Sequence, residues 1–241
     1  MQTVNHTASL AAGVLASMAM FATTSASAVI LVNDNSAPED VPEISTFQVT
    51  GAQMVGTTVR AVFSNGLDET LVWGATGVDS GGVAGTGWGL AQSGDSFVSP
   101  WTFDNLTNSL LEMIVLDGHN GFVVFDRSTD ANGGGIGFGT PNSFQGQDFV
   151  ETPTFDGIAT YSNPVGVGGN APVGDLFSVL TLDFTANATG GTSDGVDDRQ
   201  WTFLQDTDIT TDSPFHVAEP GTLGLLGATL FGLIGARRRA G

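Results

Sequence analysis

The chain has 241 residues, with 25 acidic side chains, six arginines and no lysine or cysteine, and its formal net charge is −19. This charge argues against binding to nucleic acid or to an anionic lipid surface, because phosphate groups require a basic partner. The absence of cysteine excludes disulfides, cysteine-ligated zinc and thiol catalysis, so stability must come from a hydrophobic core, with or without a metal.

Residues 1–28 have the pattern of a secretory signal peptide. An apolar run spans residues 10–22, and Ala26 and Ala28 flank Ser27 in a small-x-small cleavage site. The region before the run lacks Lys and Arg, which departs from the usual pattern. A buried N-terminal helix is the alternative, but a strand-like apolar stretch over 29–32 follows at once. We therefore predict export and removal of this segment.

Residues 29–212 are predicted to form one acidic domain, which is long enough to bury a core. Its clearest local signal is a β-hairpin. Two β-rich runs, at 57–63 and 68–73, flank Asn65-Gly66, and these two residue types tolerate the positive φ of a tight turn.

Similar β-rich runs recur along this domain between clusters of Gly, Asn, Asp and Pro. They lie near residues 44–50, 88–92, 101–105, 110–116, 121–126, 157–161, 176–186 and 199–205. The predicted loops are residues 77–87, 128–142, 162–175 and 187–198. Many short strands with glycine-rich turns predict an all-β fold, an antiparallel β-sandwich or jelly roll. Disorder is the alternative, but the large apolar side chains are too numerous for it.

Three short acidic runs are candidate calcium ligands, since Ca²⁺ takes six to eight oxygen ligands from carboxylates, amides and carbonyls. The residues are Asp126, Asp130 and Asn132 in the first run, Asp194, Asp197 and Asp198 in the second, and Asp206 and Asp208 in the third. None of the runs has EF-hand spacing. Asp and Asn are also ordinary turn residues, so a purely local role in turns is the alternative.

The four tryptophans suggest a second kind of site. Trp73 and Trp201 lie in alternating runs and are predicted to be core residues. Trp88 and Trp101 border glycine or proline loops, so they are candidates for stacking on a sugar ring. Packing in the core is the alternative for these two as well, because tryptophan in a strand is commonly buried.

No catalytic constellation stands out in the predicted domain. The available histidines are His119, in a predicted turn of this domain, and His216, in the linker before the apolar C-terminal segment, and there is no Gly-x-Ser-x-Gly or His-Glu-x-x-His motif. A paired-carboxylate glycosidase stays open, because its two acids need proximity in space rather than in sequence. We predict a protein that is not an enzyme.

Residues 213–241 contain a three-part C-terminal signal. Ala218-Glu219-Pro220 precedes an uncharged apolar segment over 221–236, and Arg237, Arg238 and Arg239 follow it. A 16-residue helix is about 24 Å long, against the ~20 residues that usually span a bilayer. The segment is therefore predicted to be a marginal transmembrane helix, with the arginines on the cytoplasmic side and the preceding domain outside.

This order of Glu219-Pro220, a Gly/Leu-rich helix and terminal arginines resembles the PEP-CTERM sorting signal of Gram-negative exopolysaccharide-producing bacteria, although Ala218 stands where the family has its first proline. The resemblance implies recognition by exosortase at the inner membrane, removal of the tail, and delivery to the cell surface or extracellular matrix. An ordinary C-terminal anchor is the alternative.

The sequence therefore predicts an exported, non-catalytic protein of the cell surface or biofilm matrix, associated with exopolysaccharide. Two alternatives stay open: a calcium-assisted carbohydrate-binding domain and a polysaccharide-acting hydrolase.

Overall fold

The computed structural model describes residues 29–33, 38–128, 146–152, 157–185 and 200–211. This part is built from β-strands and two single-turn 3₁₀ helices, η1 (Gly51–Gln53) and η2 (His119–Gly121). The prediction of an all-β fold is confirmed. Among these residues no helix has the length and apolar character needed to cross a membrane. The predicted signal peptide and C-terminal signal lie outside the described residues.

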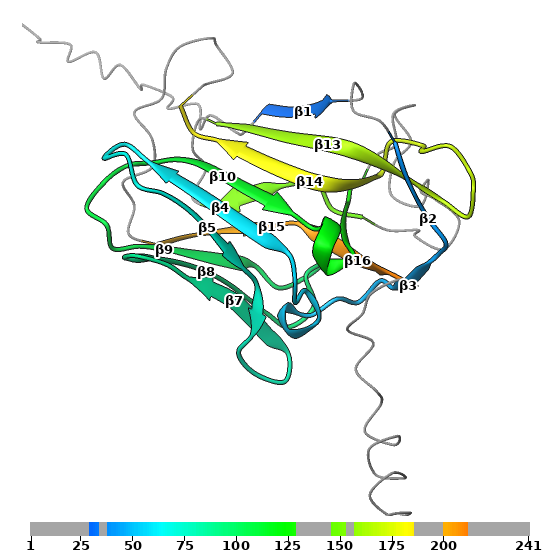
Figure 1. Ribbon diagram of the computed structural model, residues 1–241, viewed down its shortest axis with the longest axis horizontal. Coiled ribbons are helices and arrows are strands. Elements are labelled where there is room, and N and C mark those ends of the chain that lie inside the picture. The colour runs from blue at the N-terminus through cyan, green and yellow to red at the C-terminus, as the bar shows by residue number, and fades with distance from the viewer. Residues whose placement is uncertain (1–28, 34–37, 129–145, 153–156, 186–199, 212–241) are drawn as a thin grey trace, which may run out of the picture.

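The larger of two sheets has ten strands. They are β1 (Val29–Asn33), β2 (Glu39–Val41), β3 (Ile44–Thr46), β4 (Thr58–Phe63), β5 (Asp68–Val72), β10 (Leu111–Asp117), β11 (Val123–Asp126), β13 (Ile158–Val167), β14 (Leu176–Asp183) and β16 (Asp206–Thr210). The main order is β3-β16-β11-β14-β10-β4-β5. Strand β13 lies outside this order and also pairs with β14. Strands β1 and β2 pair with β13 in parallel, whereas the remaining pairs are antiparallel (Figure 1).

The smaller sheet has six antiparallel strands in the order β12-β15-β9-β8-β7-β6. They are β6 (Gly74–Ala75), β7 (Ser80–Ala84), β8 (Trp88–Ser93), β9 (Trp101–Asn105), β12 (Val150–Thr152) and β15 (Gln200–Leu204). In Figure 1, β7, β8 and β9 lie below β4, β10 and β14 of the larger sheet. Both sheets contribute side chains to one core, an arrangement consistent with a β-sandwich.

The predicted hairpin is confirmed. Strands β4 and β5 pair from Thr58 opposite Val72 to Val62 opposite Asp68. Gly66 has a φ of +86°, the conformation that the Asn-Gly pair was expected to supply. The side chain of Asn65 also accepts a hydrogen bond from the Leu67 amide at 2.9 Å, which closes the turn locally.

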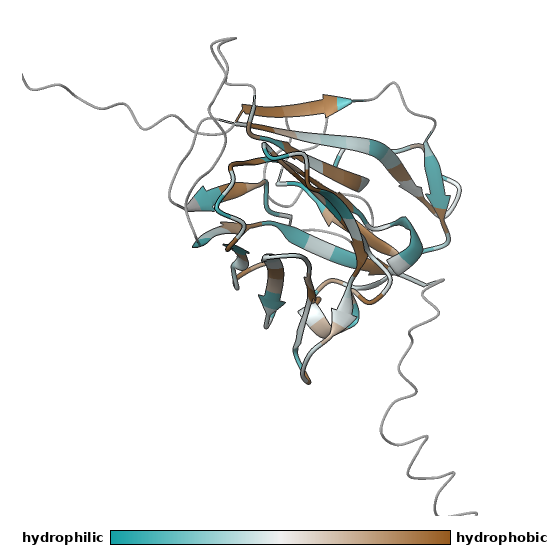
Figure 2. Cartoon of the chain, turned by 60° about the vertical axis from the view of Figure 1, so that its left-hand side comes forward, coloured by the Kyte–Doolittle hydropathy of each residue, from teal (hydrophilic) through white to brown (hydrophobic). Residues whose placement is uncertain are grey.

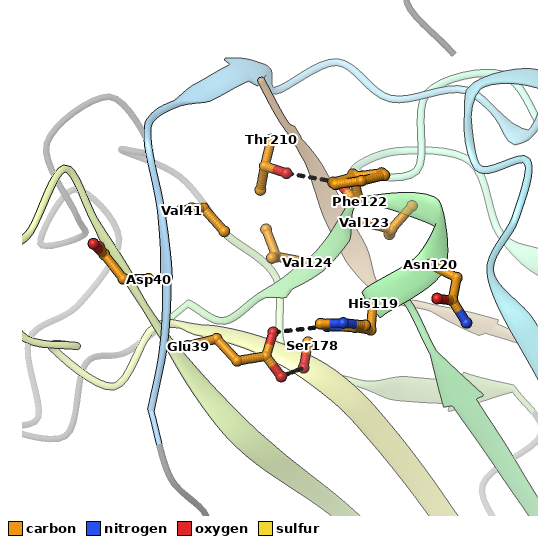
Figure 3. Close-up of a pocket in the computed structure, with 10 residues that line it drawn as sticks. All are labelled: Glu39, Asp40, Val41, His119, Asn120, Phe122, Val123, Val124, Ser178 and Thr210. Atoms are coloured by element: carbon orange, nitrogen blue, oxygen red, sulfur yellow. Dashed lines mark hydrogen bonds and ion pairs between the residues drawn. The ribbon is translucent and has the colours of Figure 1, made fainter. Parts of the chain in front are cut away.

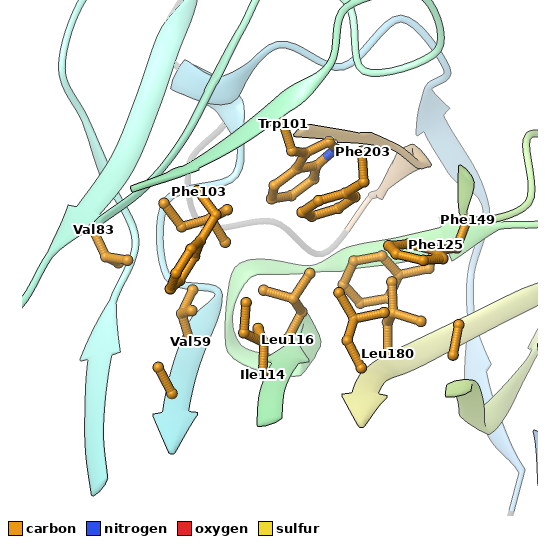
Figure 4. Close-up of a cluster of buried hydrophobic side chains, with 14 of the residues drawn as sticks. Val59, Val83, Trp101, Phe103, Ile114, Leu116, Phe125, Phe149, Leu180 and Phe203 are labelled. Carbon is orange, nitrogen blue, oxygen red and sulfur yellow. The ribbon is translucent and has the colours of Figure 1, made fainter. Parts of the chain in front are cut away.

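Aromatic rings fill the core between the sheets. Trp73 and Trp201 are each 1% exposed, so their predicted burial is confirmed. Trp101 and Phe203, from neighbouring strands of the smaller sheet, stack with their ring centroids 5.5 Å apart (Figure 4). Strand β9 shows the cause in its alternation of buried and half-buried residues, the two-residue period of a strand with one face on a core. Figure 2 shows the corresponding mixture of hydrophobic and hydrophilic residues along individual strands.

Three regions differ from the sequence-based expectation. Residues 77–87 were predicted to be a loop but contain β7, whose glycines permit close approach: a Cβ at Gly81 would lie 2.0 Å from the carbonyl oxygen of Gly51. The predicted loop over 162–175 begins later, because β13 continues to Val167. The Asp206–Asp208 run lay outside the predicted β-rich runs but belongs to the fully buried β16. Glycine and aspartate content obscured all three, since both residue types are usually depleted in strands.

A second, smaller cluster covers part of the larger sheet away from the main core. Val124 of β11 packs there with Val165 and Val167 of β13 and with Leu176 and Ile44. Val41 of β2 is packed against this cluster. Through Val41 and Ile44, the β2–β3 segment therefore packs against β11, β13 and β14.

Candidate metal centre

Three aspartate side chains converge at the end of the β11–β16 pair. Asp126 is the last residue of β11, and Asp206 and Asp208 belong to β16. One carboxylate oxygen from each lies within 4.8 Å of the others. Their exposed fractions are 1%, 1% and 0%. Among the residues that the structure describes, this is the one group of three or more acidic, histidine or cysteine side chains close enough to share a metal ion.

Strand pairing explains why the three acids meet. In the antiparallel register, Asp126 lies opposite Asp206, and Val124 lies opposite Asp208. Side chains two residues apart on a strand point to the same side, so Asp206 and Asp208 share a face with Asp126. Like charges placed directly opposite each other in a sheet are destabilising. The backbone thus concentrates negative charge at a buried point, which a cation would neutralise.

Only one of the two carboxylate oxygens of Asp206 accepts hydrogen bonds from the described residues. Its Oδ1 accepts hydrogen bonds from the Thr207 amide at 2.8 Å and from the Ser96 hydroxyl at 3.3 Å. Its Oδ2 is buried and has no hydrogen-bond partner among the described residues. A buried acceptor left in that state costs about 1–3 kcal/mol. Coordination of a cation would remove this cost.

The electrostatics of the cluster favour the binding of a cation. Burial, followed by the negative charges of Asp208 and Asp126, raises the pKa of Asp206 to about 9. Hydrogen bonds from Thr207 and Ser96 oppose this increase but do not overcome it. Without a cation, Asp206 is therefore protonated at neutral pH. A bound divalent ion would favour the carboxylate and release that proton.

Gln205 holds together the two backbone segments that carry the acids. Its Nε2 donates hydrogen bonds to the carbonyl oxygens of Asp126, at 3.1 Å, and Asp206, at 2.8 Å. Its Oε1 accepts a hydrogen bond from the hydroxyl of Tyr161. That hydroxyl in turn accepts the amide N–H of Phe149 at 2.8 Å. This buried chain fixes the backbone around the cluster, as outer-shell groups do around metal ligands.

Two further contacts close the region around Asp126. The guanidinium of Arg127 lies 5.1 Å from the centroid of the Tyr161 ring, and its Nε contacts Asp148 at 2.9 Å. Gly146 passes so close that a Cβ there would lie 2.5 Å from Asp126 Oδ1. A side chain at position 146 would therefore displace the carboxylate, so the glycine is required for the arrangement of the cluster.

The chemistry of the donors favours a hard cation. All three side chains supply oxygen, which suits Ca²⁺ and Mg²⁺ better than the softer transition metals. Calcium–oxygen distances of about 2.3–2.6 Å place opposite ligands roughly 4.6–5.2 Å apart. The aspartate oxygens, which all lie within 4.8 Å of one another, are close enough to share one such ion. Three carboxylates supply between three and six of the six to eight oxygens that calcium takes, and water or carbonyl groups would supply the others.

The sequence-based calcium prediction identified part of this cluster. Asp126 was a candidate in the first run, and Asp206 and Asp208 formed the third, but the sequence did not predict that these two runs would meet. The structure brings them together through strand pairing. The other candidates, Asp130, Asn132, Asp194, Asp197 and Asp198, lie outside the described residues. So do the sorting residues Ala218, Glu219 and Pro220, the arginines 237–239, and the cleavage residues Ala26 and Ala28.

The proposed sugar-stacking role of Trp88 and Trp101 is corrected by the structure. Trp88 is 4% exposed and Trp101 is 0% exposed, and both belong to the main core. Their indole N–H groups donate to Glu69 Oε2 at 2.7 Å and to the Gln205 carbonyl oxygen at 3.1 Å. Neither ring presents a face to solvent. Their positions beside glycine and proline loops suggested exposure, but the strands that begin with them turn both rings inward.

His119 lies in a 3₁₀ turn, as expected, and is part of a polar trio that the sequence does not reveal. Its Nδ1 lies 3.2 Å from Glu39 Oε2, and the Ser178 hydroxyl donates to Glu39 Oε1 at 2.9 Å. The carboxylate therefore lies between the serine and the histidine. A serine nucleophile needs the histidine as its direct partner, so this order does not form a catalytic relay.

Comparison with known proteins adds no assignment: no family model, no curated protein and no solved structure matches this chain.

Proposed function

We propose that this chain is an exported, non-catalytic protein of the cell surface or extracellular matrix, with a β-domain that binds a calcium ion through Asp126, Asp206 and Asp208. The observation that carries the calcium assignment is the convergence of three buried carboxylates, together with Asp206 Oδ2, which has no hydrogen-bond partner among the described residues. The proposal of export comes from the sequence, through the predicted signal peptide and C-terminal signal.

Calcium would compensate for the absence of disulfides. The chain has no cysteine, so an exported domain of this size depends on its core and on any ion it binds. A cation held by one aspartate of β11 and two of β16 would link neighbouring strands. Extracellular calcium sites commonly have dissociation constants of about 10⁻⁴–10⁻³ M. A site of that strength adds roughly RT ln(1 + [L]/Kd) to folding stability, which is close to 1.4 kcal/mol at ten times Kd.

A hydrolase based on these acids is the weaker reading. Glycosidases need two carboxyl groups on either side of a bound sugar, with room for the substrate and for water. Asp126 and Asp206 are close enough to act as a pair, but both are 1% exposed. A buried pair beneath packed strands suits an ion better than a polysaccharide.

Calcium titration of the full chain tests the metal proposal. After chelation, addition of calcium in the millimolar range should raise the midpoint of thermal unfolding, and magnesium at the same concentration should raise it less. A midpoint that does not respond to calcium would contradict the metal assignment. Recovery of the mature protein from the cytoplasm with both termini intact would contradict the proposal of export.

A further inference from the structure

A solvent-accessible pocket of about 400 Å³ lies on the larger sheet where β2 passes over β11, β14 and β16. Figure 3 shows Glu39, His119 and Ser178 on one side of it, Thr210 and Phe122 on the opposite side, and Val124 between them. The volume is near the lower end of the ~300–1,000 Å³ range of small-molecule sites. It therefore suits a single small ring rather than an extended chain.

The polar groups of this pocket are fixed before any ligand arrives. Glu39 accepts a hydrogen bond from Ser178 through one carboxylate oxygen and contacts His119 through the other, so these contacts hold both oxygens in place. The hydroxyl of Thr210 donates a hydrogen bond to the Phe122 carbonyl oxygen at 3.4 Å. His119 has a side chain that is 65% exposed, so the polar side of the pocket is open to solvent. A rigid carboxylate beside hydroxyl and imidazole groups suits a ligand that both donates and accepts hydrogen bonds.

Phe122 lines the pocket in an unusual backbone conformation. Its φ is +55° and its ψ is +33°, the left-handed region that residues with bulky side chains rarely adopt. Such strain is concentrated at binding and catalytic sites. Phe122, the residue before β11, thus has a backbone conformation that a glycine would adopt with less strain. Val41 and Val124 add apolar surface to the same lining.

The charge of the pocket excludes an anionic ligand. Glu39 and Asp40 both line the pocket, and His119 is the one basic residue among the lining residues. A phosphate or a carboxylate would meet like charge. A neutral ring with an apolar face and a hydroxyl-rich edge would place the face on Val41, Val124 and Phe122 and the edge on Glu39. Pyranose sugars have this combination.

We propose that this pocket binds one neutral pyranose unit, with Glu39 accepting hydrogen bonds from the sugar hydroxyls. The site is distinct from the buried aspartates and does not require calcium as a ligand of the sugar. The two are nevertheless neighbours, since Val124 lies opposite Asp208 in the sheet, and Thr210 follows Asp208 by two residues on β16. Metal binding at the aspartates would therefore stiffen one wall of the pocket.

Ligand-detected NMR on the full chain, in a detergent without sugar head groups, tests this proposal. The probes are the methyl glycosides of glucose, galactose and mannose, and methyl glucuronide is the anionic comparison. At least one neutral glycoside should bind with a dissociation constant of about 1 mM, which corresponds to about −4 kcal/mol. The glucuronide should bind at least fivefold more weakly. Absence of binding by all three neutral glycosides, or equal binding of the glucuronide, would overturn the proposal.

Two variants locate the binding. Glu39→Gln should weaken the preferred glycoside about tenfold, whereas Glu43→Gln, an exposed change in the same segment, should leave its affinity unchanged. Because Glu39 also contacts Ser178 and His119, Thr210→Val, which removes a hydroxyl on the opposite side of the pocket, serves as a second variant that leaves those contacts in place, and we expect at least a threefold loss. Unchanged affinity in both pocket variants would overturn the assignment. Loss of sugar binding on chelation, with Glu39→Gln still weakening the calcium-loaded protein, would show coupling between the sites and support the proposal.

Discussion

Asp126 lies directly opposite Asp206 in the antiparallel ladder between β11 and β16, so two carboxyl groups meet on neighbouring buried strands. Asp208 adds a third acid on the same face. A sheet can tolerate this arrangement in two ways: by holding a proton or by holding a cation. In the first state Asp206 holds the proton, in line with its raised pKa. In the second state, which we propose, the three carboxylates bind a calcium ion. The two states respond differently to pH, which makes them separable.

The metal-free protein should become less stable as pH rises between about 4 and 9. In this range the folded protein keeps the Asp206 proton, because the pKa there is about 9, whereas the unfolded chain has lost it at its ordinary pKa of about 3.9. The folded state binds more protons, so the free energy of unfolding falls as pH rises, by up to ~1.4 kcal/mol per pH unit from this group. Thermal unfolding in chelator at pH 5 to 8 measures the slope.

Calcium should flatten this dependence, because the loaded folded state has already released the proton. The difference in unfolding midpoint between calcium and chelator should therefore widen as pH rises. A difference that stays constant across the range would mean that calcium does not bind at a protonated carboxyl cluster.

Asp206→Asn should stabilise the metal-free protein and abolish the calcium response. The amide has nearly the same shape, carries no charge, and can donate hydrogen bonds to the neighbouring carboxylates. We expect a gain of about 1–3 kcal/mol in chelator at pH 8, which is several degrees in unfolding midpoint for a domain of this size. Asp79→Asn, in an exposed turn, is the matched control and should change neither quantity. A calcium-dependent shift that survives in Asp206→Asn would place the ion elsewhere.

Local patterns in the sequence predicted much of the fold but could not place the sites. The Asn65-Gly66 turn and the β-rich run at 101–105 are decided by neighbouring residues, and the predictions of a turn and of a strand are both confirmed. The meeting of Asp126 and Asp206 depends on the pairing of two strands that lie far apart in the sequence, and no local pattern contains that information. The same holds for Glu39, His119 and Ser178. Trp88 and Trp101 show the opposite error, since their flanking loops suggested exposure but tertiary packing buried them.

Tyr161 should not ionise while the protein remains folded. Burial, and then the negative charge of Asp148, raises its pKa well above the ordinary value. The chain contains a single tyrosine, so the ultraviolet absorbance of tyrosinate reports this residue alone. The absorbance should appear only when the domain unfolds at high pH, and the urea-denatured chain, which is the control, should titrate near 10. Ionisation near pH 10 in the folded protein would contradict the buried position.

Tyr161→Phe should destabilise the domain and weaken calcium binding together. Removing the hydroxyl leaves the Phe149 amide and Gln205 Oε1 without this partner, at a cost of about 1–3 kcal/mol. Gln205 would then hold the Asp126 and Asp206 carbonyl groups less rigidly. Loss of an outer-shell partner commonly lowers metal affinity 10- to 100-fold, so calcium titration should show a drop of about tenfold. Lower stability with unchanged calcium affinity would separate this hydrogen-bond chain from the metal site.

Replacing Glu219-Pro220 with Ala-Ala tests the sorting half of the proposal. If the C-terminal signal is read by an exosortase, the variant should accumulate at full length in the inner membrane, because the apolar segment and its arginines still hold it there. The parent chain should instead yield a shortened, released protein in a host that carries exosortase. Immunoblots of membrane and culture fractions with an antibody to the β-domain distinguish the two outcomes. A Thr222→Ala variant, just beyond the motif, is the control and should be processed normally. Unchanged release of a shortened protein from the Glu219-Pro220 variant would mean that the tail is an ordinary anchor cut by another protease.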